Sequence, residues 1–168
     1  MSPGTIKFRL VPEVRYNERR AVGFLEGHGE LNAGAVFESL DTQQRNFLRV
    51  SIDLWVDGAN GPATRFHGFP NDKDYWMCFT FKAKESRQHH RFYGYLDNPQ
   101  PVLNRRFQVC VLCVHAMKSE HETDRSELER VRVWYASGGG KQAVQTVFPD
   151  GKEEKGQQKG RVLKWKRK

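Results

Sequence analysis

The sequence contains no stretch of eighteen consecutive apolar residues and no apolar segment near its beginning. The first absence excludes a membrane-spanning helix, and the second leads us to expect a cytoplasmic protein without a signal peptide. Cysteine is also scarce, with three residues among 168. An odd cysteine count in a chain without an export signal favours free thiols over disulfides.

Net positive charge is nearly missing from the body of the chain, although the total is +8. Residues 151–168 hold eight Lys or Arg and two Glu, whereas residues 1–150 hold twenty basic and eighteen acidic residues. Net charge therefore gives little support for nucleic-acid binding by residues 1–150, and such binding has to be inferred from where the basic residues lie. The basic tail suits either contacts with RNA or a solubilising terminus.

Three consecutive strands are predicted between Tyr75 and Lys118, at Trp76–Lys82, Arg91–Leu96 and Phe107–Val114. β-branched and aromatic residues dominate them, and polar loops separate them. The third segment is apolar throughout from Val109 to Val114, which predicts a central strand buried on both faces.

Alternation along the second strand places Arg91, Tyr93 and Tyr95 on one face. We expect that face to be solvated, with phenol rings that stack on bases and cations that hold phosphates. A structural alternative stays open, in which Arg91 pairs with a carboxylate such as Glu85 and the tyrosines only pack across strands.

The remaining pattern predicts an α+β fold. A strand is expected at Thr5–Val11, helices at Ala33–Leu40, Thr42–Val56 and Arg125–Ala136, and Asp41 with Gln44 has the spacing of a capping box. We predict a small antiparallel, mixed-edge sheet packed against two N-terminal helices, with a C-terminal helix. Residues 1–140 would form this domain, and residues 141–168 a basic extension that is a hairpin or disordered.

Four segments of the chain resemble the RelE/HigB-type toxins of toxin–antitoxin systems. They are the helical pair VFESLDTQQRNFLRVSIDLW, the strand YWMCFTFKAK, the arginine-bearing strand RFYGYL, and the final strand with its loop and helix start, FQVCVLCVHAMKSEHETDRSELERV. The resemblance covers roughly residues 33–132 and the first strand, and this chain is identified as a divergent member.

The resemblance implies a ribosome-dependent mRNA endonuclease in which the ribose 2′-hydroxyl attacks the adjacent phosphate, without a metal or another cofactor. Arg91 matches the central arginine, Lys118 the basic residue after the last strand, and His121 or Asp124 stands near the acid–base position. Expected partners are mRNA, the ribosome and a cognate antitoxin protein, with no membrane.

Positions where some relatives carry strand lysines hold Met77 and Phe79 here. We therefore expect RNA contacts from neighbouring groups, namely Lys82, Lys84, Tyr93, Tyr95 and Arg125. The alternative function is a non-catalytic RNA- or protein-binding module on the same fold.

Zinc binding is a further alternative, because Cys110, Cys113, His115 and His121 resemble half a zinc site. Strand geometry opposes it, since positions three apart on a strand face opposite ways. His89 and His90 are expected to be solvated in a hairpin tip, and His115 to be structural.

Overall fold

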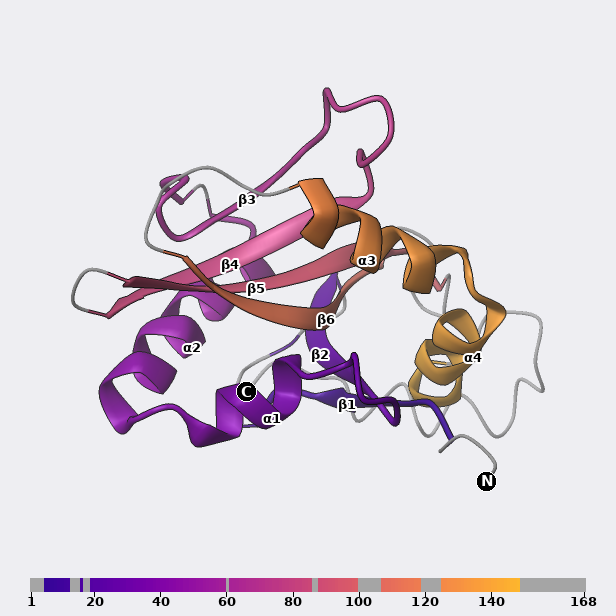
Figure 1. Cartoon of the computed structure of the whole chain (residues 1–168), viewed down its shortest axis with the longest axis horizontal. Helices are drawn as coiled ribbons and strands as arrows, with labels where there is room; N and C mark the ends of the chain where they lie inside the picture. The colour runs from indigo at the N-terminus through magenta and orange to yellow at the C-terminus, as the bar shows by residue number, and fades with distance from the viewer. Residues whose placement is uncertain are drawn as a thin grey trace.

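The computed structural model describes residues 5–12, 16, 19–59, 61–85, 88–99, 107–118 and 125–148. In that part of the chain a six-stranded sheet and four helices form an α+β architecture (Figure 1). In chain order the elements are β1 (Lys7–Leu10), β2 (Arg20–Glu26), α1 (Ala33–Ser39), α2 (Thr42–Val56), β3 (Phe66–Gly68), β4 (Cys78–Glu85), β5 (Gln88–Asp97), β6 (Gln108–Lys118), α3 (Arg125–Ala136) and α4 (Gly138–Val147).

The sheet is mixed, in the order β1-β2-β6-β5-β4-β3. β2 and β6 pair in parallel, and the other neighbouring pairs are antiparallel. β6 lies between β2 and β5, and Val109–Val114 are buried, which confirms the predicted central strand. Parallel pairing needs a long connection, and here the connection contains α1, α2, β3, β4 and β5.

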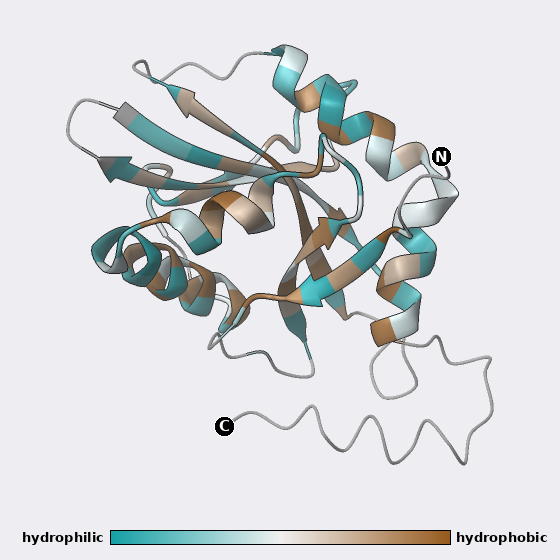
Figure 2. Ribbon diagram, turned by 60° about the horizontal axis from the view of Figure 1, so that its bottom comes forward, coloured by the Kyte–Doolittle hydropathy of each residue, from teal (hydrophilic) through white to brown (hydrophobic). Residues whose placement is uncertain are grey.

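Helices cover both faces of the sheet, and its central strands are apolar on both sides, whereas the far end of the β4–β5 hairpin is hydrophilic (Figure 2). Phe37, Leu48 and Ile52 of α1 and α2 pack with sheet residues on one face. Leu128 and Val144 of α3 and α4 pack on the other face. The sheet is therefore the middle layer of a sandwich, and β2, β4, β5 and β6 divide their apolar side chains between two cores.

α2 begins and ends where the sequence predicts. Asp41 caps it, because its carboxylate oxygen accepts a hydrogen bond from the backbone nitrogen of Gln44 at 2.8 Å. The buried positions of this helix include Leu48, Ile52 and Trp55, which lie on the side facing the sheet. The hydrophobic periodicity thus fixes which side of α2 packs.

Two parts of the fold differ from the expectation. The two helices are not N-terminal, because β1 and β2 precede them in the chain. Residues 138–147 form helix α4 rather than a hairpin or disordered segment, and Val144 and Phe148 are fully buried. Burial of this apolar side outweighs the low helix propensity of the glycines at its start. Residues 149–168 lie outside the described residues.

α2 is the longest described helix, with 15 residues, and no described helix has the length and apolar content needed to cross a bilayer.

Candidate functional site

A cationic pocket of about 440 Å³ lies beside the β4–β5 hairpin, at the sheet edge that carries β3. The hairpin extends past α3, at the left of Figure 1. The residues lining the pocket are Phe47, Thr64, Arg65, Lys82, Lys84, His89 and Arg91. None of these described residues is acidic, so the pocket favours an anionic ligand.

Strand register brings the basic residues of this pocket together. Lys82 is paired with Arg91, and Lys84 with His89, across β4 and β5. Cross-strand partners share a face, and residues two apart along a strand share it too. Lys82, Lys84 and Arg91 were predicted as separate site residues, and the structure places all three around one pocket.

Arg91 is only 1% exposed and lines the buried side of the pocket. Lys82 beside it is half-buried, and burial lowers the pKa of its ammonium group, with a further lowering by the charge of Arg91. Both effects reflect positive charges held close together away from water. A bound phosphate would offset that repulsion with its own negative charge.

Arg65 and Phe47 close the pocket on the side of α2. The Arg65 guanidinium carbon lies 4.1 Å from the centre of the Phe47 ring, and its Nη1 donates to Ser51 Oγ at 2.8 Å. Neither residue was a predicted site residue. Phe47 has the spacing of the apolar side of a helix, and Arg65 lies in a turn that shows no pattern. The backbone nitrogen of Lys82 donates a hydrogen bond to the backbone carbonyl oxygen of Arg65. No pattern in the sequence predicts this contact between the two segments.

Lys118 ends β6 and is paired by register with His89, so it belongs to the same face of the sheet as Arg91. Its ammonium group lies 2.7 Å from a carboxylate oxygen of Glu127 in the first turn of α3. Their side chains are 18% and 10% exposed. This mostly buried ion pair attaches α3 to the end of β6, which limits the access of a phosphate to Lys118.

His67 on β3 lies near the same cations. Burial lowers the pKa of its imidazole, and the charges of Lys82 and Arg91 lower it further. Nδ1 lies 3.0 Å from the Gly68 carbonyl oxygen, which can accept a hydrogen bond from a protonated Nδ1. A neutral ring in this tautomer carries its lone pair on Nε2.

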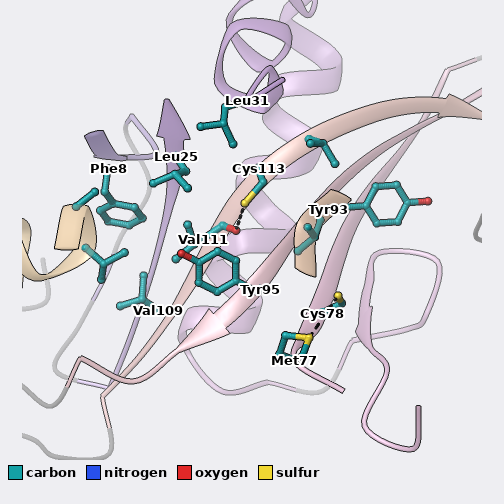
Figure 3. Close-up of a cluster of buried hydrophobic side chains, with 14 of the residues drawn as sticks. Phe8, Leu25, Leu31, Met77, Cys78, Tyr93, Tyr95, Val109, Val111 and Cys113 are labelled. Atoms are coloured by element: carbon teal, nitrogen blue, oxygen red, sulfur yellow. Dashed lines mark hydrogen bonds between the residues drawn. The ribbon is translucent and has the colours of Figure 1, made fainter. Parts of the chain in front are cut away.

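Tyr93 and Tyr95 do not form the expected solvated stacking surface. They are 0% and 2% exposed, because α3 and α4 cover this part of the face. Figure 3 shows Tyr95 and Cys113 directed into one cluster with Leu25 and Val111. Their role is packing, the structural alternative that the sequence left open.

Arg125 lies outside the pocket lining. Its guanidinium forms ion pairs with Asp72 at 2.9 Å and Asp74 at 3.5 Å and lies 4.7 Å from the Tyr75 ring centre. The side chain is 60% exposed, so solvent screens these contacts. His121, the expected acid–base residue, lies outside the described residues.

His90 is buried rather than solvated, and it forms a histidine pair with His115. His90 Nδ1 and His115 Nε2 are 2.9 Å apart. The backbone nitrogen of His115 also donates to Asn32 Oδ1 at 2.9 Å. These contacts hold β5, β6 and the start of α1 together, which supports the structural role expected of His115.

This histidine pair should make stability depend on pH. Burial, followed by the charge of His90, lowers the pKa of His115 to about 4 from an ordinary value of 6.5. The folded state therefore favours neutral His115. The stabilisation that neutral His115 adds to the free energy of unfolding is fully present above pH 6.5 and is lost as the pH falls toward 4. Between pH 7 and pH 5 the wild-type protein should lose about 1–2 kcal/mol more unfolding free energy than a His115→Gln variant.

Urea unfolding at both pH values measures that difference. Gln43→Ala, at an exposed position of α2, changes no titratable group and is the control that should keep the wild-type pH dependence. Equal pH dependence in the wild-type protein and His115→Gln would show that the pair does not titrate with folding.

The three cysteines are buried, free thiols. Cys110 packs in the core under α1 and α2, whereas Cys113 packs in the core under α3 and α4, as the strand geometry predicts. Burial raises the pKa of both thiols, and thiolates are the form that binds metals. Among the described residues, no group of three His, Cys, Asp or Glu side chains is placed to hold a metal ion.

Comparison of this chain with protein-family models, with curated proteins and with solved structures gave no match. The assignment of a function therefore depends on the pocket and on the order of the elements around it.

Proposed function

We propose that the protein binds single-stranded RNA by its phosphates in the cationic pocket and acts as a ribosome-dependent mRNA endonuclease. The observation that carries the proposal is the gathering of Arg65, Lys82, Lys84 and Arg91 around one pocket whose described lining has no acidic residue. Phosphate is the anion that repeats along RNA, and paired arginine and lysine groups bind it through charge-assisted hydrogen bonds.

The order of the elements supports the same proposal. β1, the helices α1 and α2, the antiparallel strands β4, β5 and β6, and α3 occur in the order expected from the resemblance to RelE/HigB-type toxins, with β2 added after β1 and β3 added before β4. A RelE-like fold, a cytoplasmic location beside translating ribosomes, and a cognate antitoxin as the neutralising partner all belong to this proposal.

The chemistry needs positive charge around one phosphate. In the proposed reaction a 2′-hydroxyl gives its proton to a general base, its oxygen bonds to the neighbouring phosphorus, and the bond from phosphorus to the 5′-oxygen breaks. The leaving 5′-oxygen takes a proton, so the products are a 2′,3′-cyclic phosphate and a 5′-hydroxyl. Arg91 and Lys82 would stabilise the negative charge on the phosphate oxygens as the new bond forms.

A non-catalytic RNA-binding module is the second candidate, and one observation favours it. Lys118, the second expected catalytic cation, is engaged by Glu127 at 2.7 Å. An ion pair of this kind has to open before Lys118 can reach a phosphate. Binding at the remaining cations does not require that step.

The salt dependence of RNA binding tests the property that both candidate functions require, which is phosphate binding in the cationic pocket. Lys84→Gln removes an exposed cation from the pocket lining, so it should weaken RNA binding by a similar factor for all sequences. The slope of log K against log salt should become shallower by about 0.7 for the loss of one phosphate contact with single-stranded RNA. Lys7→Gln, an exposed lysine on β1 at the opposite sheet edge, should leave the slope unchanged. Equal slopes for both variants would contradict the pocket as the binding site.

Cleavage separates the two candidates. Purified protein added to a translating extract should cut a labelled mRNA, and should leave the same mRNA intact in buffer without ribosomes. New 3′ ends should carry the cyclic phosphate. Salt-sensitive binding without cutting in the extract would leave the binding module as the function.

A further inference from the structure

We propose that Phe47 and Arg65 form a stacking platform for one unpaired RNA base, next to the phosphate-binding cations. This inference rests on the proposed function and adds the kind of ligand that the pocket selects. It would make the protein prefer single-stranded RNA over duplex RNA, because a base in a duplex is already stacked and paired.

The platform is assembled before any ligand arrives. The Arg65 guanidinium lies over the Phe47 ring at 4.1 Å and donates to Ser51 Oγ at 2.8 Å. Ser51 Oγ in turn donates to the carbonyl oxygen of Phe47 at 3.1 Å, one turn earlier on α2. The ring and the hydroxyl therefore hold the guanidinium from the same helix. A preorganised group loses little conformational freedom when a ligand binds.

The chemistry of the two groups suits a base better than a second phosphate. A guanidinium is planar and stacks on flat rings, and RNA-binding proteins stack unpaired bases on aromatic and arginine planes. The Nη1 that reaches Ser51 is already engaged. Arg65 thus offers a positioned plane, whereas Lys82 and Lys84 offer ammonium groups that suit phosphate oxygens.

The size of the pocket agrees with a nucleotide rather than a bare phosphate. About 440 Å³ is within the range of pockets that hold small organic ligands, roughly 300–1,000 Å³. The aromatic ring and the basic residues line the same pocket. A nucleotide bound with its phosphate at Lys82, Lys84 and Arg91 has room to place its base against Arg65.

The test compares two ligands of equal length and charge, a single-stranded oligoribonucleotide and its abasic counterpart. Arg65→Lys keeps the positive charge and removes the plane. It should weaken binding of the oligoribonucleotide roughly fivefold or more, the usual loss for one stacked base. Binding of the abasic strand should change by less than about twofold, because the phosphate contacts persist. Phe47→Leu, which keeps an apolar side chain but removes the aromatic ring, should shift binding in the same direction.

Lys84→Gln is the matched control, since it removes a phosphate contact and should weaken both ligands alike. Equal weakening of both ligands by Arg65→Lys would assign Arg65 to phosphate binding and overturn the platform. Equal affinity of the wild-type protein for the two strands would overturn the platform and leave the proposed function standing. If the wild-type protein binds neither strand, both proposals fall.

Discussion

An Arg91→Gln variant is expected to cut mRNA about 10²–10³-fold more slowly than the wild-type protein, the usual loss when one donor to a transition-state oxyanion is removed. Arg91 is 1% exposed and lines the pocket, so its charge acts where water screens it little. The expected loss is in the rate of cleavage, because charge builds up on the phosphate oxygens as the bond forms. Single-turnover cleavage in a translating extract measures it.

Loss of a buried arginine can also affect folding, and a second variant addresses this. Arg91→Lys keeps the charge but loses the planar fork, so its rate should fall between those of wild type and Arg91→Gln. Thermal unfolding of each variant shows whether it folds. Lys7→Gln at the far edge of the sheet should cut at the wild-type rate. Folded Arg91→Gln protein with undiminished cleavage would remove Arg91 from the proposed mechanism.

The largest expected effect on stability comes from Gly94→Ala. Gly94 lies at the irregular step in the pairing of β5 with β6, next to Tyr93. A Cβ atom at this position would lie 2.1 Å from the Val111 oxygen and 2.8 Å from Leu112 Cα. Both are backbone atoms of the central strand, so no side-chain rotation relieves the overlap. We expect the free energy of unfolding to fall by about 3 kcal/mol or more.

Gly29→Ala is the matched control, because a Cβ there meets nothing within 4 Å. Its unfolding free energy should show no loss beyond about 0.5 kcal/mol. Chemical denaturation compares the two variants. The comparison requires that the unfolding free energy fall with denaturant concentration at the same slope in both. Wild-type stability in Gly94→Ala would mean that β5 and β6 do not approach each other this closely.

The parts of the fold that sequence analysis predicted correctly have strong local signals. α2 is bounded by the Asp41 cap and by the end of its apolar periodicity. The strands of the Tyr75–Lys118 region were placed to within a few residues, because alternation and separating loops mark them. The parallel pairing of β2 with β6 could not be predicted in the same way, because it joins segments about 88 residues apart in register, such as Arg20 and Gln108.

The candidate site was predicted only in part, for a related reason. Lys82, Lys84 and Arg91 were selected from single strands, and the register of β4 and β5 joined them in one pocket. Arg65 reaches the same pocket from the turn just before the three-residue edge strand β3, and neither segment is long enough to show a pattern. Tyr93 and Tyr95 have the alternation of an exposed face, but periodicity does not reveal whether a distant helix covers that face.

The sequence by itself determined where α1, α2, α3 and the central strand run, because capping and hydrophobic periodicity act between residues close in the chain. Only the tertiary structure decided which basic side chains meet. It also decided that α3 and α4 bury the tyrosines and that Glu127 engages Lys118. The physical reason is that these contacts depend on strand register and helix docking, which are set by burial summed over the whole sheet rather than by any local segment.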